Sequence, residues 1–571
     1  MSDARSVLRK YFGYPDFRPA QRAAVLSVLG GRDTLIVMPT GGGKSLCYQI
    51  PALLRPGLTL VVSPLIALMH DQVNGLERRG IAAALVNSTL SSDEIRARLD
   101  RAAAGELKLL YVAPERFGSP AFRSAAFDME IGLVAVDEAH CVSQWGHDFR
   151  PSYLRLKRHW DELGRPQLIA LTATATPEVR ADIVRELGLR DPRVMIRGFD
   201  RPNLRWSVRR EDRRAEKGRA LLEQMDGRAG ETAVVYASTR KMVEAATELL
   251  RDAGVVAAAY HAGMKREARA RVQERWMSGQ VPVVVATNAF GMGIDKEDVR
   301  RVVHLQMPGS LEAYYQEAGR AGRDGKEAHC VLLHSYGDRF IHEFFIRQSY
   351  PPRRIIAAAY RALLDACTAE GGPVPPLNFV ARVKGLKSEG ELTSALRILN
   401  DAGCIENAGA AADCAARWIA TPERVEEIVA DPGDSSEFSE SPAVMAALNG
   451  LARISRSGRR RSFRVSLRDV ARWLDADIAE ARAALDALQR AGLIGWRDEA
   501  RSSTYRPTRP AQSPDELTVD WERIARLREL DLQKLKRMEG YAFSRGCRRR
   551  YLLRYFGETA GWKCGACDRC G

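Results

Sequence analysis

Short apolar runs alternate with longer segments whose apolar residues recur at a helical period. In the first 200 residues an apolar run ends just before a glycine-rich stretch that starts at Gly41, and four more runs follow, at 58–63, 107–112, 133–136 and 167–171. Strand-length apolar runs separated by helix-length segments are typical of a parallel sheet with crossover helices. The pattern therefore predicts an α/β domain over residues 1–200.

A second set of the same kind lies further along the chain. Residues 195–215 interrupt the rhythm with Pro202 and a charged run, which indicates a crossing between domains. The later apolar runs lie at 232–236, 255–260, 281–286, 302–305 and 330–333. We predict a second α/β domain over 201–345.

The pattern changes beyond residue 345. Residues 395–405 and 484–494 share the pattern AL-x-x-L-x-x-AG-x-I, a helix ended by a glycine that enters a strand. This likeness predicts two helix-turn-helix or winged-helix modules, at 346–425 and 440–510, separated by an acidic polar segment. Two short helices can also resemble each other by chance. In the second module, residues 496–505 are expected to form the wing.

The glycine-rich stretch has the composition of a phosphate-binding loop. It reads MPTGGGKS, in which the glycines let phosphates approach the backbone and the following helix start favours an anion. The lysine would reach the β and γ phosphates, and the hydroxyl beside it would ligate Mg²⁺. Met38 stands where the strict pattern has glycine. The expected nucleotide-binding residues of the loop are Thr40, Gly41, Gly42, Gly43, Lys44 and Ser45.

Upstream of the loop, Arg18 and Gln21 follow a turn flanked by aromatic residues. A side-chain amide offers the donor and acceptor that match the adenine edge, so Gln21 is a candidate base reader. The alternative is an ordinary glutamine on a helix surface.

Carboxylates follow the apolar run at 133–136, in the sequence DEAH. At the carboxyl end of a strand, Asp137 is placed to hold Mg²⁺ through water, Glu138 to polarise an attacking water, and His140 to sense phosphate. A helix N-cap is the alternative interpretation of the acidic pair.

Aromatic and polar residues come directly after these carboxylates, in the sequence CVSQWGHDFRPSY. Bases can stack on exposed aromatic rings, so the segment is a candidate loop for sensing a bound strand, whereas packing in a core is the alternative. The candidate residues for DNA contact are Gln144, Trp145, His147, Phe149 and Arg150.

The second α/β domain contains YYQEAGRAGRDGK at 314–326. Arg320 and Arg323 are expected one helical turn apart, where they would contact the γ-phosphate when the two domains close. Arg323 is the candidate arginine finger.

Charge and cysteine content extend this picture. The 571 residues carry a net charge of +15 with a pI near 9.4, which indicates a polyanionic partner or a solvated basic surface. Residues 453–468 hold seven arginines and no acid, and Arg459, Arg460 and Arg461 form their centre, a candidate contact to duplex DNA. No apolar run approaches 18 residues and no signal peptide is evident, so an intracellular, cytoplasmic protein without membrane attachment is expected.

Four cysteines cluster near the end of the sequence with metal-ligand spacing: Cys547, Cys564, Cys567 and Cys570. Four thiolates make a closed structural Zn²⁺ site. The neighbouring arginines, at 545, 548, 549, 550 and 554, are expected to form a basic face near DNA.

Together these motifs resemble those of the RecQ family of DNA helicases, in helicase superfamily 2. The resemblance covers residues 8–345, and the zinc segment also resembles the RecQ zinc module, here at the extreme C-terminus. It implies two RecA-like parallel-sheet lobes, ATP, Mg²⁺ and Zn²⁺ as cofactors, and 3′ to 5′ translocation on single-stranded DNA with unwinding of duplex DNA in recombination, repair or replication. It also implies the residue roles given above, with the loop at 143–150 coupling DNA contact to hydrolysis.

Two other functions remain open from the sequence. One is a nucleotide-switched DNA-binding or annealing protein, against which the intact hydrolytic carboxylates argue. The other is an RNA helicase, because the DEAH motif by itself is compatible with that activity. A single-strand-binding protein or repair proteins are expected partners, and in a bacterium the protein would be associated with the nucleoid.

Overall fold

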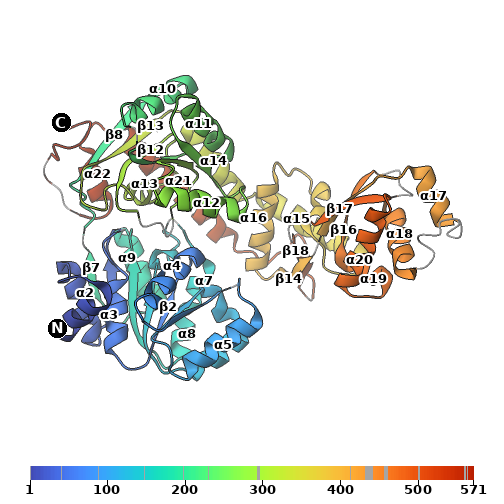
Figure 1. Cartoon of the computed structure of the whole chain (residues 1–571), viewed down its shortest axis with the longest axis horizontal. Coiled ribbons are helices and arrows are strands. Elements are labelled where there is room, and N and C mark those ends of the chain that lie inside the picture. The colour runs from blue at the N-terminus through green and yellow to red at the C-terminus, as the bar shows by residue number, and fades with distance from the viewer. Residues whose placement is uncertain are drawn as a thin grey trace. The chain divides into compact units, whose positions relative to one another are not determined.

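The computed structural model describes residues 2–39, 41–87, 89–146, 148–196, 198–228, 230–291, 296–411, 413–430, 441–455, 461–498, 502–508, 510–558, 561 and 563–571. It divides into two units (Figure 1). Residues 1–344 and 529–571 form the larger unit, which contains two lobes and the cysteine-rich segment. Residues 345–528 form the inserted unit.

Lobe 1 is built on a seven-stranded parallel sheet with the order β3-β4-β2-β5-β6-β1-β7. Its strands are β1 (Thr34–Val37), β2 (Leu58–Val62), β3 (Ala83–Val86), β4 (Leu109–Val112), β5 (Ile131–Val136), β6 (Gln167–Thr172) and β7 (Arg193–Ile196). The central strands are buried on both faces, as expected for continuous apolar runs in a parallel sheet. The predicted α/β domain is confirmed.

Helices connect these strands. They are α1 (Ser2–Val7), η1 (Leu8–Phe12), α2 (Pro19–Leu29), α3 (Leu46–Leu54), α4 (Ile66–Glu77), α5 (Ser92–Ala103), η2 (Pro114–Gly118), α6 (Pro120–Phe127), η3 (Ala139–Val142), α7 (Pro151–Leu154), α8 (Leu156–Glu162) and α9 (Pro177–Leu187). In α9 the hydroxyl of Thr176 accepts from the Val179 amide at the start, and Gly188 ends the helix at φ 65°. A hydroxyl N-cap and a left-handed glycine fix both ends.

Lobe 2 is built on a six-stranded parallel sheet with the order β10-β11-β9-β12-β13-β8. Its strands are β8 (Leu204–Arg210), β9 (Thr232–Tyr236), β10 (Ala257–Tyr260), β11 (Val283–Ala286), β12 (Val299–His304) and β13 (Ala328–His334). Its helices are α10 (Arg214–Met225), α11 (Arg240–Asp252), α12 (Arg266–Met277), α13 (Leu311–Ala318) and α14 (Asp338–Ser349). The second predicted α/β domain is therefore also confirmed.

The cysteine-rich segment docks on the open edge of the lobe 2 sheet. It follows α21 (Trp521–Phe543) and α22 (Arg548–Tyr555). Trp206 on β8, the edge strand, bridges to Cys567, with the Asp568 amide donating to the Trp206 carbonyl at 3.0 Å. The zinc segment, remote in sequence, thus lies against lobe 2 in space.

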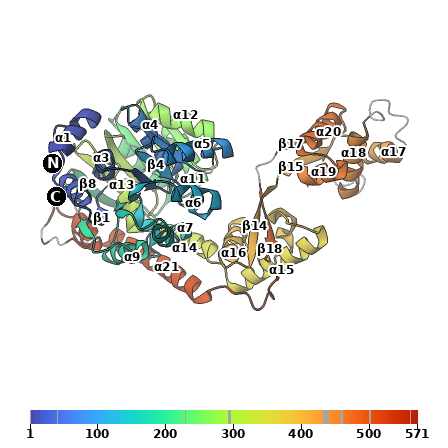
Figure 2. The same ribbon diagram turned by 90° about the horizontal axis from the view of Figure 1, so that it is seen from below.

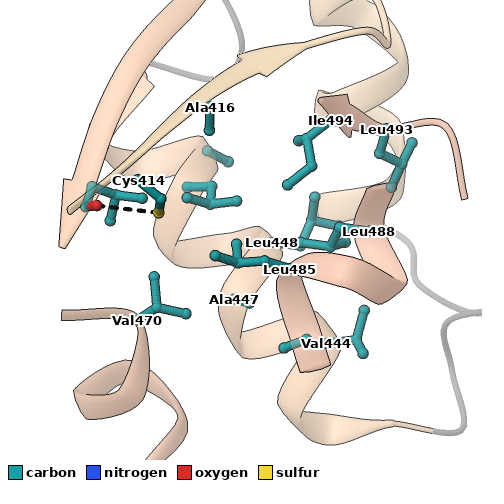
Figure 3. Packing of buried hydrophobic residues seen from close by; sticks show 14 of the residues in the cluster. Cys414, Ala416, Val444, Ala447, Leu448, Val470, Leu485, Leu488, Leu493 and Ile494 are labelled. Carbon is teal, nitrogen blue, oxygen red and sulfur yellow. Dashed lines mark hydrogen bonds between the residues drawn. The ribbon is translucent and has the colours of Figure 1, made fainter. Parts of the chain in front are cut away.

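The inserted unit contains two modules, each built of helices and a small antiparallel sheet. The first comprises α15 (Arg353–Glu370), η4 (Pro376–Asn378), η5 (Val380–Arg382), α16 (Glu389–Asp401), β14 (Ile405–Ala411) and β18 (Ser502–Pro507). The second comprises β15 (Asp413–Trp418), α17 (Pro422–Ala430), α18 (Pro442–Ser455), β16 (Ser462–Ser466), α19 (Leu467–Leu474), α20 (Ile478–Arg490) and β17 (Ile494–Asp498). Figure 3 shows Leu485, Leu488 and Ile494 in the core of the second module.

The predicted repeat recurs in the structure as two matching helix ends. After α16, Gly403 adopts φ 69° and the Cys404 amide donates to the Leu399 carbonyl. After α20, Gly492 adopts φ 69° and the Leu493 amide donates to the Leu488 carbonyl. Both helices then lead directly into strands, β14 and β17.

The predicted wing at 496–505 is wrong, because its two strands lie in different sheets. β18 pairs with β14 of the first module, whereas β17 pairs with β15 of the second. Ile405 and Ile494 occupy equivalent positions in the repeat. Ile405 lies opposite Pro507, whereas Ile494 lies opposite Trp418. In the first module β14 thus pairs with a strand that follows the whole second module, whereas β15, expected in the first module, lies in the sheet of the second. Figure 2 shows both strand pairs.

These strand pairings also change the module boundaries, which were expected at residues 425, 440 and 510. Helices α17 and α18, on either side of the acidic segment, pack in one core. Leu517 and Val519 pack in the core of the first module, beyond the expected end of the second. The second module is therefore inserted between β14 and β18, the two paired strands of the first module.

Candidate active site

Glycine determines the shape of the loop between β1 and α3. Gly41 and Gly43 have φ values of 79° and 73°, the left-handed region that side chains disfavour. A Cβ on Gly43 would lie 2.2 Å from Nε2 of Gln21, and one on Gly42 would lie 2.9 Å from the Pro39 carbonyl. The turn therefore needs all three glycines.

Lys44 lies within this loop. Its Nζ donates to the carbonyls of Met38, at 3.0 Å, and Pro39, at 3.4 Å. Burial lowers the pKa of Lys44, and the nearby carboxylates of Glu138 and Asp137 oppose that shift. The ammonium is thus adjacent to both carboxylates but directed into its own loop.

Arg18 and Gln21 hold the same loop from α2. Arg18 donates to the Gly41 carbonyl at 2.8 Å, and Nε2 of Gln21 donates to the Gly42 carbonyl at 3.1 Å. Oε1 of Gln21 accepts from the Arg18 amide. Both sequence candidates therefore contact the loop, whereas Thr40 lies outside the described residues.

Asp137 and Glu138 follow the end of β5. Burial raises the pKa of Asp137 to about 7, with a further rise from Glu138 and an opposing effect of Lys44. Glu138 adopts φ 46°, uncommon for a residue with a side chain, and its amide donates to Oδ1 of Asp137 at 2.9 Å. Backbone strain of this kind clusters at functional sites.

His140 connects the carboxylates to β6. Its Nδ1 lies 3.3 Å from Oε2 of Glu138 and 2.8 Å from Oγ1 of Thr172, and burial lowers its pKa to about 4. Thr172 also donates to the Thr174 carbonyl. No role is expected for Thr172 from its motif alone, and a hydroxyl at the end of an apolar strand is the signal in the sequence that points to it.

A cavity of about 900 Å³ brings residues of both lobes together. Its lining includes Arg18, Gln21, Gly41, Gly43, Lys44, Ser45, Asp137 and Glu138 from lobe 1, and Arg320 and Arg323 from lobe 2. Cγ of Arg323 lies 3.3 Å from the position of a Cβ on Gly41. Arg320 donates to the Gly291 carbonyl.

The two arginines do not share a helix face, contrary to the prediction. Helix α13 ends at Ala318, and both residues lie in the turns that follow. Gly319 caps the helix through the Tyr315 carbonyl, and Gly322 adopts φ 57°. The glycines of AGRAGR therefore stop the helix before the arginines.

The aromatic segment at 143–150, which we call the aromatic loop, is attached to lobe 1. Oγ of Ser143 donates to Oδ2 of Asp182 at 2.7 Å and accepts from the Trp145 amide at 3.1 Å. The Trp145 side chain is exposed, whereas Gln144, Phe149 and Arg150 are half-buried. His147 lies outside the described residues.

Arg150 contacts two other parts of lobe 1. It pairs with Asp148 at 3.0 Å and donates to the Pro64 carbonyl at 3.0 Å. The basic stretch in the inserted unit is described only in part. Arg461 is exposed just before β16, and Arg459 and Arg460 lie outside the described residues.

The four clustered cysteines fit a zinc ion. The Sγ atoms of Cys547, Cys564, Cys567 and Cys570 all lie within 4.8 Å of one another. Thiolates bound tetrahedrally at about 2.3 Å lie roughly 3.8 Å apart, so a small adjustment closes the shell. All four positions would be taken by protein, which suits a structural site.

The expected basic face around this site is wrong for two of its arginines. Arg548 is fully buried and forms a bidentate pair with Asp568, at 3.0 and 3.2 Å. Arg549 is also buried and pairs with Asp200, just before lobe 2. Buried arginines need such partners. Arg548 joins α22 to the cysteine-rich turn within the zinc segment, and Arg549 joins the segment to the rest of the unit.

Comparison with protein families gives three matches. Residues 18–183 match the DEAD/DEAH box helicase model, residues 216–325 the helicase conserved C-terminal domain, and residues 517–571 the RecQ zinc-binding model. The first two matches lie in lobe 1 and lobe 2, so each lobe is similar to one of the two conserved helicase domains. The third covers all four clustered cysteines, and the predicted zinc-binding module is confirmed.

Curated relatives show a higher similarity over the two lobes. The chain is 47% identical over 348 residues to the ATP-dependent DNA helicase RecQ of Bacillus subtilis, covering 61% of this chain and 58% of the relative. It is 45% identical over 356 residues to the protein of that name from Pasteurella multocida, covering 62% and 56%. The two lobes and the zinc segment are therefore similar to those of RecQ helicases. It spans under three fifths of the length of these two relatives.

Solved structures support the fold. The crystal structure of the DUF1998 helicase MrfA bound to DNA aligns with a TM-score of 0.51 at 20% identity, over 72% of this chain and 62% of that one. At this identity the likeness concerns the fold alone. In the part of the chain that the structure describes, no helix is long and apolar enough to cross a membrane.

Proposed function

We propose that the protein is an ATP-dependent DNA helicase that moves 3′ to 5′ along single-stranded DNA and unwinds duplex DNA. The observation that carries this proposal is the cavity between the lobes. It places Lys44, Asp137 and Glu138 of lobe 1 opposite Arg320 and Arg323 of lobe 2. The RecQ relatives supply the preference for DNA.

The candidate residues that line the cavity have proposed roles in ATP binding and hydrolysis. Lys44 turns from its loop carbonyls to the β and γ phosphates, and Gln21 and Arg18 support adenine binding. Ser45 and Asp137 would hold Mg²⁺, which neutralises phosphate charge. Glu138 orients the attacking water, with its own carboxylate fixed beside His140. Arg323 stabilises the charge that develops on the γ-phosphate.

Lobe closure and reopening would drive movement along DNA. ATP favours closure because both lobes contact it, and hydrolysis removes the contacts of Arg320 and Arg323. The aromatic loop, with Trp145 exposed, senses the strand and begins three residues after His140. Contacts to the phosphate backbone give little base readout, so binding should weaken as salt rises.

Strand displacement tests this proposal. DNA and RNA duplexes that carry a 3′ or a 5′ tail are incubated with protein, ATP and Mg²⁺. Displacement of the 3′-tailed DNA supports the proposal. Preference for RNA indicates an RNA helicase, and annealing without displacement indicates a nucleotide-switched binding protein.

The proposed role also sets the expected surroundings of the protein. Its partners are single-stranded and duplex DNA, in recombination, repair or replication. A cytoplasmic protein associated with the nucleoid has access to both. Proteins that bind single strands are the expected protein partners.

A further inference from the structure

A buried lysine from the zinc segment reaches the aromatic loop of lobe 1. Nζ of Lys534, on α21, donates to the Gly146 carbonyl at 2.8 Å across 388 residues of sequence. The Lys534 side chain is only 11% exposed, and Asp531, one turn away on the same helix, lies 3.3 Å from Nζ. Burying an ammonium is costly unless it is hydrogen-bonded, and the Gly146 carbonyl and the Asp531 carboxylate meet that need for Lys534.

The Lys534 contact lies at a position where neighbouring backbone atoms closely surround the loop. A Cβ on Gly146 would lie 2.3 Å from the His140 carbonyl, and the Gly146 amide donates to the Ser143 carbonyl. The Gly146 peptide is therefore held between His140 on one side and Lys534 on the other. Since His140 lies beside Glu138, the contacts run from α21 to the hydrolytic carboxylate.

The same helix is fixed to lobe 2. Glu539 pairs with Arg339 on α14 at 3.0 Å, and the Tyr541 hydroxyl donates to that of Tyr314 on α13 at 3.4 Å. Lys534 lies five residues before Glu539, so it moves with lobe 2. A change in the angle between the lobes would therefore act on the Gly146 contact.

The structure that contains this contact also has the Lys44 side chain directed into its own loop. In the conformation in which Lys534 holds Gly146, Lys44 donates to the carbonyls of its own loop. The aromatic loop cannot move away from α21 unless Lys534 first releases the Gly146 carbonyl. The Lys534 contact therefore restrains the loop in the conformation described here.

We propose that Lys534 is a positioning residue that holds the aromatic loop at rest, and so makes ATP hydrolysis depend on DNA. The inference rests on the proposed function, because it concerns the same ATPase site. DNA binding at the aromatic loop would compete with the Lys534 contact. Release of Gly146 then frees the loop, and with it His140 and Glu138.

The test compares Lys534→Met with the wild type in ATP turnover over a range of single-stranded DNA concentrations. A hydrogen bond from a charged donor shifts an equilibrium by roughly tenfold or more. Turnover without DNA should therefore rise several-fold, and half-maximal activation should need several-fold less DNA. Maximal turnover should stay within about twofold. Amide exchange at 143–146 should become faster.

Two further variants serve as controls. Lys536→Met removes an exposed lysine from the same helix and should leave both quantities unchanged. Lys534→Arg keeps a cationic donor and should restore most of the dependence on DNA. Zinc content and melting temperature show whether each variant is folded.

Three results would overturn the inference. One is an unchanged ratio of stimulated to basal turnover in a folded Lys534→Met. Another is a fall in stimulated turnover with basal turnover unchanged, which would assign the contact to the active conformation. The third is an equal effect of Lys536→Met. A wild type without DNA-stimulated hydrolysis would instead contradict the proposed function.

Discussion

The aliphatic stem of Arg323 packs on Gly41, with its Cγ 3.3 Å from the position that a Cβ on the glycine would take. An arginine of lobe 2 thereby closes over the phosphate loop of lobe 1. The loop tolerates this approach because it has no side chain there.

Arg323→Ala should lower kcat for ATP by about 10³-fold or more, because an arginine finger acts mainly on the transition state. Nucleotide affinity should change only a few-fold. Steady-state ATPase assays with single-stranded DNA and equilibrium nucleotide binding measure the two effects. Arg219→Ala, at an exposed position on α10, is the control. An Arg323→Ala variant with normal kcat would reject the assignment.

Lys44→Ala should abolish ATP hydrolysis and unwinding while DNA affinity remains nearly normal. The lysine lies in the cavity between the lobes, apart from the exposed aromatic ring of Trp145. Turnover and fluorescence anisotropy of labelled DNA are the measurements. Lys241→Ala, on the surface of α11, should leave both unchanged. If hydrolysis persists in Lys44→Ala, the phosphate site lies elsewhere.

Mg²⁺-dependent nucleotide binding should weaken as pH falls from 8 to 6. The pKa of Asp137 is raised to about 7, so its carboxyl binds a proton below that pH and then cannot hold the metal. At pH 6 the loss should approach tenfold, since about one carboxylate in ten remains ionised. Titration of Mg²⁺-nucleotide at several pH values measures it.

The same shift has a consequence for stability. A raised pKa means that the folded state binds the proton more tightly than the unfolded state, so Asp137 costs stability as pH rises from about 4 through 7. Asp137→Asn should therefore raise the melting temperature more at pH 8 than at pH 5. Equal shifts at both values would contradict the raised pKa.

Replacing Trp145 and Phe149 by Ala should mainly lower DNA-stimulated turnover, with basal turnover less affected. Base stacking contributes about 1–3 kcal/mol per base, so the concentration of DNA needed for activation should rise about tenfold. Phe127→Ala removes an aromatic residue that is 75% exposed elsewhere on lobe 1 and is the control. Unchanged stimulation of turnover by DNA would show that the aromatic loop serves only in packing within the protein.

Cys567→Ser should lower zinc content below one per chain and destabilise the larger unit. Structural zinc contributes on the order of 10 kcal/mol to folding, and Cys567 also bridges to β8. Metal analysis and thermal unfolding are the measurements. Cys367→Ser, in the inserted unit, is the control and should retain full zinc content. A wild type without stoichiometric zinc would defeat the prediction.

The sequence predicts the lobes well because their determinants are local. Apolar runs specify buried parallel strands, and left-handed glycines such as Gly41 specify the phosphate loop. The cysteine spacing likewise specifies the metal ligands. These features need only a few adjacent residues.

The features that the sequence did not predict depend on distant partners. The pairing of Ile405 with Pro507 joins residues about a hundred positions apart, with no local signal for which strand is taken. The partners of Arg548 and Lys534 were hidden for the same reason, because an arginine or lysine on a helix is usually solvated. Burial, not spacing, shows their role.

The bridge between Trp206 and Cys567 can form only after the ribosome has synthesised nearly the whole chain. Its two halves are separated by about 360 residues, so at roughly 5–20 residues per second the ribosome needs about 20–70 s to supply the second half. Throughout that interval the outer side of β8 is an uncovered template for strands of neighbouring nascent chains. Placing the inserted unit before the zinc segment therefore lengthens the time in which a growing chain is vulnerable to aggregation.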